Sequence, residues 1–513
     1  MAKNNKKILN KQFTVRLSST HPAQRVKYVD IYNYCIQAFK QARHQEAAFI
    51  CQQVVEAFPS DLASKVLLGN ILFQLNDLAG LKRLVETLSI THAKAVESKS
   101  IAAAYFSLVN DSDEAIRCYR EILAITPYSS DIHTSLAIQY MNCGDFEKSK
   151  RSFSRALKIN PVDVNAIYSR TLLLRGELSD EDIDHIESLL GTPQLKEDDV
   201  ARLHFSLALA YRHRDIDKEA VSLGLANRAA ASVRPYSPLQ EAQAFELFRG
   251  SINRQLLNEV WQDRQSRSSP VFIASMPRSG STLLERMLSS HSAVCGIGES
   301  DAMFQAYQVA SAKVGLQASF WSQASSEERS QFLQCVQDQF ESHPLVGTAA
   351  PLRVLDKSIS NALMAGTIAA VYPQAKIIYL QRNPLDVVLS CYQHYFPNGH
   401  NYIFNLEHSA LEYKLFDKWM LSLAEEVPEN VLVVSYEKLT SSPSSELRKI
   451  LEFCDLEWED DVLNFSSSSS VTRSDVMMNT REGVYTSAQN RWRNYKLMLK
   501  PAADVLGIDL DKK

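Results

Sequence analysis

The stretch VFIASMPRSGSTLLERMLSSHSAVCGIGE, residues 271–299, decides the fold of the C-terminal half. Its first four residues, 271–274, form an apolar run that predicts a short buried strand. Pro277 and Gly280 then allow a sharp turn, and apolar residues at helical spacing follow from Leu283. A helix that starts after Gly and hydroxyl residues presents free N–H groups and the positive end of its dipole. The stretch therefore predicts a strand, an anion-binding turn and a helix, and the anion is most often a phosphate.

Two later apolar runs have the same character. They are KIIYLQR at 376–382 and VLVVSYE at 431–437, and helical patterns lie between the three runs. Strands that alternate with helices are typical of an α/β domain with a central parallel sheet. Ligands of such domains bind at the C-terminal ends of the strands. We therefore expect an α/β domain over 270–513, with a phosphate-loop-like turn at 277–282.

The predicted turn differs from the phosphate loop of kinases in one respect. A Walker A loop carries a Lys directly before its Ser or Thr, where it binds the terminal phosphates. Here no Lys precedes Ser281, and the positive charge of the turn is Arg278. An ordinary strand-to-helix turn would also explain a Ser-Gly pair taken alone.

A second strand end favours the anion site over the ordinary turn. Arg382 closes the second apolar run, and Asn383 and Pro384 suit the cap and the first position of a following helix. Ser390 then lies two turns into that helix. An Arg and a hydroxyl in this arrangement can bind a second phosphate together.

The N-terminal half contains an internal repeat. Pro127 and Pro161 lie one period of about 34 residues apart, Pro59 lies two such periods before Pro127, and small residues recur at fixed distances before these prolines. This spacing is typical of tetratricopeptide (TPR) repeats, which pair two helices in each unit and stack into an α-solenoid. We expect at least four repeats from about Tyr28 to Val164, with more degenerate helical pairs to about Ser237. A generic helical bundle is the alternative.

These patterns divide the chain into four parts. We predict a basic N-terminal arm at 1–27, a TPR-like helical repeat domain at 28–237, a helical linker at 238–269 and the α/β domain at 270–513. The repeat array should offer a curved surface that holds a peptide, a partner chain or a second copy of the chain as a homodimer. The sequence does not choose among these partners.

Composition excludes several classes of protein. The 513 residues are 45% apolar and 22% charged, with a formal net charge of -4, which gives no sign of a nucleic-acid surface. No apolar run reaches the length of a membrane span, and the N-terminus lacks the apolar core of a signal peptide. The eight cysteines form no Cys-x-x-Cys pair, which argues against a zinc site and a disulfide scaffold. We expect reduced thiols in a cytoplasmic protein.

In the order in which its motifs occur, the half from Pro270 onward resembles the sulfotransferases that use 3′-phosphoadenosine-5′-phosphosulfate (PAPS). Within that family it is similar to the tyrosylprotein sulfotransferase-like group and its bacterial TPR-containing relatives. The motifs that carry the resemblance are the turn at 277–283, the element Gly298-Glu299, the pair Asp356-Lys357, the residues Arg382 and Ser390, the strand at 435–439 and the pair Arg491-Trp492. The tyrosylprotein branch usually has two Glu residues where this chain reads Glu299-Ser300.

The resemblance implies roles for single residues. The cofactor-binding residues would be Arg278, Ser279, Gly280, Ser281 and Thr282 at the 5′-phosphosulfate, Arg382 and Ser390 at the 3′-phosphate, and Ser487 and Arg491 in a segment that folds over the nucleotide. The catalytic residues would be Arg278 and Lys357 as cations and Glu299 as the general base. For Arg491, a plain helix start with Trp492 in the core is an alternative.

Two histidines are rival candidates for the general base. His291 follows the predicted phosphate-binding helix, and His394 lies in the helix after Arg382. Each of them can equally serve as a capping or packing residue. The sequence shows no cluster of metal ligands, and the cations can take the place of Mg²⁺, so we expect no metal requirement.

The leading functional hypothesis is therefore a PAPS-dependent sulfotransferase with a TPR array. It would move a sulfuryl group in line to an acceptor hydroxyl of a peptide tyrosine, a glycan or a small phenol or alcohol. The TPR array favours a peptide, a protein or another large acceptor. The alternatives are a TPR scaffold with a non-catalytic nucleotide-binding domain and a small-molecule kinase, against which the absent Walker Lys argues.

Overall fold

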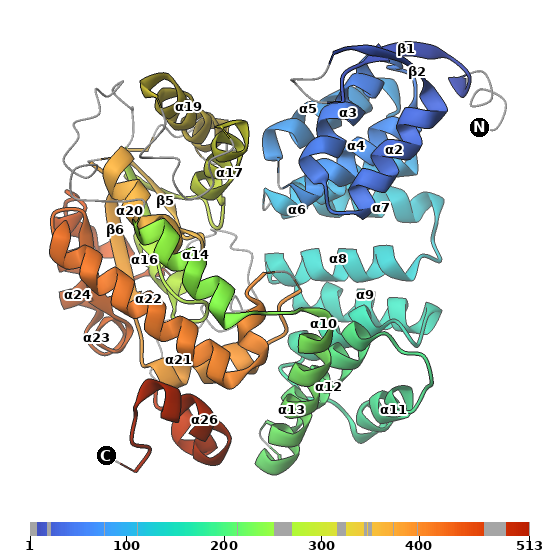
Figure 1. The fold of residues 1–513 in the computed structure, drawn as a ribbon. Coiled ribbons are helices and arrows are strands. Elements are labelled where there is room, and N and C mark those ends of the chain that lie inside the picture. The colour runs from blue at the N-terminus through green and yellow to red at the C-terminus, as the bar shows by residue number, and fades with distance from the viewer. Residues whose placement is uncertain are drawn as a thin grey trace. The chain divides into compact units, whose positions relative to one another are not determined.

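The computed structural model describes residues 8–17, 22–75, 77–109, 111–212, 214–250, 269–314, 325–342, 346, 351–372, 374–397, 399–465 and 489–511. The chain forms two compact units, 1–161 and 162–513 (Figure 1). The boundary at 161 falls inside the predicted repeat domain of 28–237, because the later helical pairs pack with the α/β domain. The predicted limits of the four parts remain predictions, and residues 251–268 of the predicted linker lie outside the described residues.

The first unit is built from helical pairs that repeat with the predicted period. The first helices of the pairs are α2 (Tyr28–Lys40), α4 (Leu62–Gln74), α6 (Val96–Leu108) and α8 (Ser130–Cys143). The second helices are α3 (His44–Ala57), α5 (Leu78–Thr91), α7 (Ser112–Ile125) and α9 (Phe146–Ile159). Small side chains such as Cys35, Ala47 and Ala115 are fully buried where paired helices meet. The predicted TPR array is confirmed.

Part of the predicted N-terminal arm is folded. Strands β1 (Gln12–Val15) and β2 (Gln24–Lys27) form an antiparallel pair ahead of α2. Val15 is buried, and the Phe13 ring packs edge-on against Phe58 at the end of α3. The apolar residues of this basic segment therefore add a small sheet to the first helical pair.

The second unit begins with four more helices. They are α10 (Val164–Leu173), α11 (Asp180–Leu190), α12 (Glu197–Tyr211) and α13 (Ile216–Val233). Helices α10 and α11 begin one repeat period after α8 and α9, so the repeat continues into this unit. Phe205 of α12 and Leu223 of α13 belong to the same apolar core as strand residues of the sheet. The last helical pair is therefore part of the α/β domain in packing terms.

The α/β domain contains a five-stranded parallel sheet in the order β4-β5-β3-β6-β7. The strands are β3 (Ser269–Ala274), β4 (Val294–Gly296), β5 (Arg353–Asp356), β6 (Lys376–Gln381) and β7 (Val431–Ser435). Alternate residues of β3 face opposite sides: Phe272 joins one core, and Val271 and Ile273 join the other. Both faces of the sheet are thus covered, as a parallel sheet requires, and the predicted fold class is confirmed.

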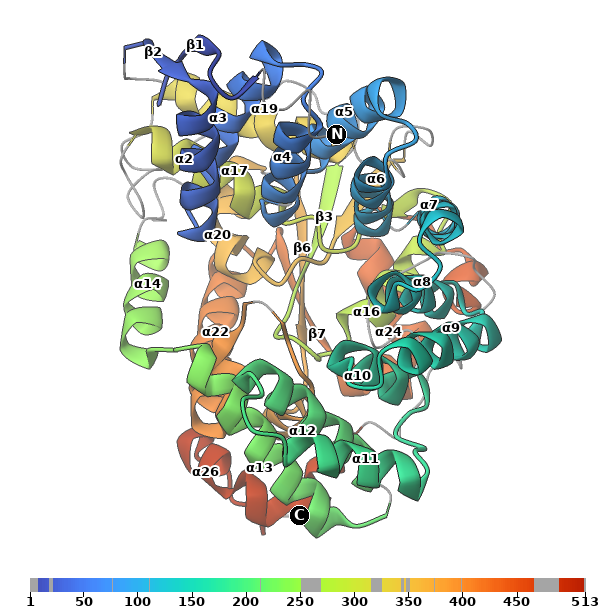
Figure 2. The same cartoon turned by 90° about the vertical axis from the view of Figure 1, so that its right-hand side faces the viewer.

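Helices lie on both sides of the strands (Figure 2). One side is covered by α17 (Ala302–Val314), α19 (Ser326–Ser342), α20 (Asn361–Val371) and α22 (Leu406–Glu426), with α14 (Pro238–Gly250) packed against α20 and α22. The other side is covered by α16 (Ser281–Ser289), α23 (Tyr436–Ser441) and α24 (Pro443–Phe453). Helix α21 (Pro384–Tyr392) packs with the 3₁₀ turns η1 (Asn401–Phe404) and η4 (Arg491–Tyr495) and with the C-terminal α26 (Lys496–Leu506).

Candidate active site

The turn between β3 and α16 is shaped to bring its backbone close to a ligand. Gly280 has a φ of 104°, and a Cβ on it would lie 2.5 Å from the ring of Tyr436, so only Gly fits. No side chain in the described part of the chain caps the N-terminus of α16. The first N–H groups of the helix, at Ser281 and Thr282, are therefore left available to an anion. This is the local structure that the sequence predicts.

The Arg278 side chain reaches from this turn to the helix behind β6. Its Nε donates to Ser390 Oγ at 3.2 Å, and its Nη2 lies 3.0 Å from His394 Nε2. Arg382, at the end of β6, donates from Nη1 to the Arg278 carbonyl oxygen at 2.8 Å. The structure therefore brings together Arg278, Arg382 and Ser390, although the turn and the second strand end are far apart in the sequence.

Tyr436 packs on both of these elements. Its ring lies against Gly280, and the Arg382 guanidinium carbon is 4.5 Å from the ring centroid. A cation held over an aromatic face keeps its charge while its side chain is fixed. Arg382 is 8% exposed, so its position is set by packing rather than by solvent.

His394 supports Arg278 and is not placed to act as a base. Its Nδ1 lies 2.7 Å from the Ser390 carbonyl oxygen, which can only accept, so we assign the proton to Nδ1 and the lone pair to Nε2 facing Arg278. Burial, with the charges of Arg278 and Arg212, holds the pKa of His394 well below its usual value. The neutral His394 imidazole, with both of its nitrogens hydrogen-bonded, therefore holds the Arg278 guanidinium in its orientation.

His291 also has a structural environment. Its Nε2 lies 2.8 Å from the Glu457 carbonyl oxygen, and its Nδ1 accepts from the Ala293 N–H at 3.1 Å. The side chain is 4% exposed. These contacts tie the end of α16 to the segment after α24, which explains why a buried histidine stands there.

Lys357 and Glu299 form an ion pair at the neighbouring strand ends. Lys357 follows β5, and its Nζ is 2.7 Å from Glu299 Oε1 in the turn after β4. The lysine side chain is 4% exposed, whereas that of Glu299 is 50% exposed. Burial acts to lower the pKa of Lys357, but the carboxylates of Glu285 and Glu299 outweigh it and raise the pKa. The lysine is therefore a buried cation, and the glutamate can reach solvent.

Asp356 organises the turns that carry this pair. Its carboxylate accepts from the Ser358 N–H at 2.7 Å and from Asn361 Nδ2 at 2.8 Å, and it also accepts from Ser300 Oγ. Asp356 is 1% exposed. Ser300 therefore contributes to holding the turn in place at the position where the tyrosylprotein branch usually has a second Glu.

The segment before α26 closes over α21. Asp386 accepts from the backbone N–H of Asn490 at 2.7 Å and of Trp492 at 3.0 Å. Arg491 Nη2 donates to Gln393 Oε1 at 3.1 Å, and Trp492 is buried in the core beneath it. The buried Trp492 agrees with the helix-start hypothesis, and the contact of Arg491 with a phosphate stays a prediction. The predicted phosphate ligand Ser487 lies outside the described residues.

Comparisons with known proteins agree with this geometry. Residues 270–460 match the family described as the sulfotransferase family, and residues 131–163 match the tetratricopeptide repeat. This C-terminal part is a sulfotransferase-family domain. The resemblance inferred from the motifs is therefore confirmed for the sulfotransferase domain and for the repeats.

Two curated relatives cover different parts of the chain. An uncharacterized protein of Aquifex aeolicus (strain VF5) is 26% identical over 456 residues, which are 85% of this chain and 58% of that protein. A Caenorhabditis briggsae protein named "Putative protein-tyrosine sulfotransferase" is 29% identical over 206 residues, which are 38% of this chain and 68% of that protein. The chain thus spans little more than half the length of the Aquifex relative.

Solved sulfotransferase structures are also similar to parts of the chain. The sulfotransferase domain from the Synechococcus PCC 7002 olefin synthase is 21% identical and covers 49% of this chain and 99% of its own, with a TM-score of 0.35. Mouse sulfotransferase SULT7A1 complexed with PAP is 16% identical and covers 50% of this chain and 89% of its own, with a TM-score of 0.30.

Sequence reasoning missed two buried carboxylates of the sulfotransferase domain and its flanking helices. Glu285 lies on α16, and Glu219 of α13 binds Arg212 Nε at 3.0 Å, Gln393 Nε2 at 3.1 Å and the Tyr495 hydroxyl at 2.7 Å. Through Gln393, Glu219 supports Arg491. The available signal for Glu285 was its place in the apolar run from Leu283 to Leu288, where a charged residue needs a partner.

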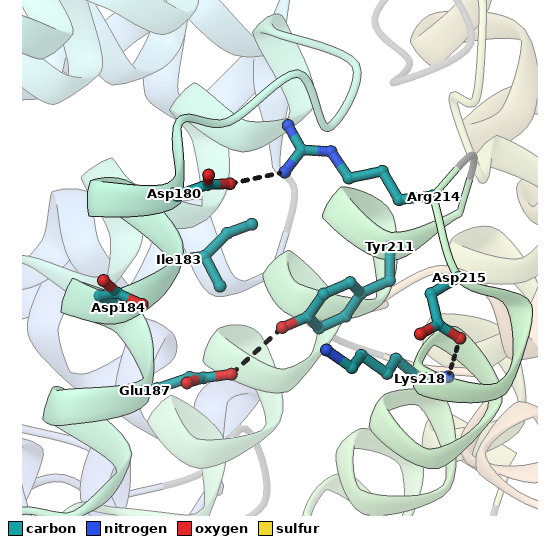
Figure 3. A pocket seen from close by; sticks show the side chains of 8 residues that line it. All are labelled: Asp180, Ile183, Asp184, Glu187, Tyr211, Arg214, Asp215 and Lys218. Atoms are coloured by element: carbon teal, nitrogen blue, oxygen red, sulfur yellow. Dashed lines mark hydrogen bonds and ion pairs between the residues drawn. The ribbon is translucent and has the colours of Figure 1, made fainter.

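A surface hollow of about 380 Å³ lies between α11, α12 and α13 (Figure 3). Arg214 pairs with Asp180 at 3.4 Å across it, and the Tyr211 hydroxyl donates to Glu187 at 3.1 Å. Of the charged side chains that line it, Arg214 and Asp180 form an ion pair, and no predicted site residue lines it. The predicted site residues lie at the strand ends instead.

Three further features bear on the functional classes. Among the described residues, no three His, Cys, Asp or Glu side chains are grouped so that they could hold a metal ion. No described helix combines the length and the apolar character that a bilayer crossing needs. Five of the eight cysteines, Cys35, Cys51, Cys118, Cys391 and Cys454, are buried free thiols.

Proposed function

We propose that the sulfotransferase domain moves a sulfuryl group from PAPS to an acceptor hydroxyl. The observation that carries the proposal is the convergence of Arg278, Arg382 and Ser390 beside the uncapped start of α16. Two guanidinium groups, a hydroxyl and helix N–H groups form a site for a ligand with phosphates at both ends. The 5′-phosphosulfate would bind at residues 279–282 with Arg278, and the 3′-phosphate at Arg382 and Ser390 with Arg491 and Ser487 nearby.

The reaction is an in-line displacement at sulfur. A bond forms between sulfur and the acceptor oxygen, the bond between sulfur and the 5′-phosphate oxygen breaks, and adenosine 3′,5′-bisphosphate leaves. Negative charge grows on the departing oxygen. Arg278, Lys357 and the N–H groups at the start of α16 would stabilise that charge, since they are fixed before the substrate arrives.

Glu299 would accept the acceptor's proton. Half of its side chain is exposed, so an incoming hydroxyl can reach it, and the neighbouring Lys357 holds it in place at 2.7 Å. The engaged nitrogens of His291 and His394 favour Glu299 over either histidine. The proton passes from Glu299 to solvent when the sulfated product leaves. No step in this scheme needs a metal ion, and the rate should be unchanged by EDTA.

The repeats would supply a surface for a partner protein, and we propose that this partner is a peptide or protein acceptor or a second copy of the chain. The free thiols, several of them buried, favour a reducing compartment such as the cytoplasm. The chemistry of the acceptor is the finer part of the proposal: a peptide tyrosine, a glycan hydroxyl and a small phenol or alcohol all present the same reacting oxygen.

Two measurements test the proposal. Adenosine 3′,5′-bisphosphate should raise the melting temperature of the protein, and ATP with Mg²⁺ should not. The reverse preference would indicate a kinase, and a melting temperature that responds to neither ligand would indicate a scaffold. Transfer of labelled sulfate from PAPS should then be screened across tyrosine peptides, glycans and phenols. Arg278→Ala and Lys357→Ala should abolish this transfer, and full rates in both variants would contradict the assigned roles.

A further inference from the structure

Glu285 is a buried carboxylate beside the proposed catalytic pair of Lys357 and Glu299. It lies one turn into α16, directly behind the phosphosulfate turn, and is 1% exposed. Its Oε1 accepts from the Gly298 N–H at 2.9 Å, and its Oε2 is 3.9 Å from Lys357 Nζ. Oε2 has no hydrogen-bond partner among the described residues. One side chain thus contacts both the turn that carries Glu299 and the lysine that pairs with it.

Both backbone polar groups of Gly298 form hydrogen bonds. Its N–H donates to Glu285, and its carbonyl oxygen accepts from the Lys357 N–H at 2.9 Å. Gly298 has a φ of 72°, which residues other than Gly adopt rarely, so the turn favours a glycine at this position. Because Glu299 follows directly, the carboxylate of Glu285 fixes where the base stands.

The charges of this cluster change during the proposed reaction. Two carboxylates, those of Glu285 and Glu299, lie 3.9 and 2.7 Å from the single ammonium of Lys357. When Glu299 takes up the acceptor's proton, it becomes neutral and its attraction for Lys357 is lost. Glu285 then remains as the carboxylate that holds the lysine, and at 1% exposure it is shielded from bulk solvent.

We propose that Glu285 is a positioning residue for sulfuryl transfer, which fixes the Gly298–Glu299 turn and keeps Lys357 charged and in place once Glu299 is protonated. The inference rests on the proposed function. Burial raises the pKa of Glu285 to about 7 against the opposing charge of Lys357, with Glu299 and Asp356 adding to the rise. Its ionised form is therefore costly, and α16 carries it where an apolar side chain would be expected.

Glu285→Gln is the decisive variant, because it keeps the shape of the side chain and removes the charge. We expect kcat to fall roughly 10- to 100-fold, as for other displaced catalytic groups, with the affinity for adenosine 3′,5′-bisphosphate within about twofold of the wild type. The wild-type kcat should rise with pH through about 7, and this inflection should be absent from the variant. Glu446→Gln is the matched control, since Glu446 is also buried and has Lys449 at 2.6 Å on α24.

A substrate-free readout tests the same contact. In Glu285→Ala the Gly298 N–H loses its acceptor, so its hydrogen exchange should become roughly tenfold faster or more, while the amides of α24 stay protected. Unchanged exchange would overturn the inference whatever the enzyme does. A kcat of Glu285→Gln within about twofold of the wild type, with the same pH profile, would overturn it as well.

Failure of the proposed function has a different signature. A wild-type protein that binds no adenosine 3′,5′-bisphosphate and transfers no sulfate contradicts the proposed function, and exchange at Gly298 then decides whether Glu285 fixes the turn. If Glu285→Gln loses kcat, nucleotide affinity and the folded state together, Glu285 has only a structural role and the inference is wrong.

Discussion

The buried charge of Glu285 should make the stability of the second unit depend on pH. The folded protein raises the pKa of Glu285 from 4.5 to about 7, so folding favours the protonated form. The cost of ionising the group is absent below pH 4.5, grows as the pH rises towards 7, and is complete above it. At about 1.4 kcal/mol for each pKa unit, the full cost is roughly 3 to 4 kcal/mol, and most of it appears between pH 5 and pH 8.

Glu285→Gln removes this titration and leaves all other groups in place. The free energy of unfolding of the variant, relative to that of the wild type, should therefore increase by about 2 to 3 kcal/mol from pH 5 to pH 8. Asp301 and Glu412, whose pKa values burial also raises, contribute equally to both proteins and cancel in the difference.

Urea unfolding followed by tryptophan fluorescence measures this difference. All five Trp residues lie between positions 261 and 492, so their emission reports on the second unit and not on the first. Glu446→Gln, unfolded under the same conditions, is the control for replacing a buried Glu by Gln. A constant difference for Glu285→Gln over the same range, or one that decreases as the pH rises, would refute the reasoning, because Glu285 would then ionise as easily in the folded chain as in the unfolded one.

Three further outcomes test the site. Gly280→Ala should lose adenosine 3′,5′-bisphosphate binding and stability, because its Cβ would lie 2.5 Å from the Tyr436 ring. The control is Gly507→Ala, which also has a positive φ but open space around the Cβ, so it should lose only the strain energy of about 1 kcal/mol. Equal decreases in the melting temperatures of the two variants would contradict the clash. Arg382→Ala should weaken nucleotide affinity roughly tenfold or more in calorimetry, and an unaltered affinity would exclude its phosphate role. Glu299→Gln should reduce turnover and leave nucleotide binding nearly unchanged, whereas a full rate would show that another group is the base.

Local patterns in the sequence were enough to predict the repeats and the turn between β3 and α16. A helical hairpin closes within one repeat period, so its prolines and small residues reappear at a fixed spacing, and α2, α4, α6 and α8 begin at that spacing. The turn before α16 is equally local, since an apolar run, Gly280 and the apolar residues from Leu283 on follow one another directly. The repeat period and the order of residues along the chain are therefore sufficient to predict these elements.

Contacts between distant segments were decided by the tertiary structure alone. The sheet order places β5 beside β3 although β4, α17 and α19 lie between them in the chain, and it thereby sets Lys357 between Glu299 and Glu285. The role of His394 was also decided by the tertiary structure. From the sequence it was a rival candidate for the general base, and in the folded chain it contacts Arg278. The sequence by itself determined which elements form and which of them bear charged groups. Only the packed sheet decided which charges meet and which of them lose water, because burial and pairing depend on neighbours that the local pattern does not contain.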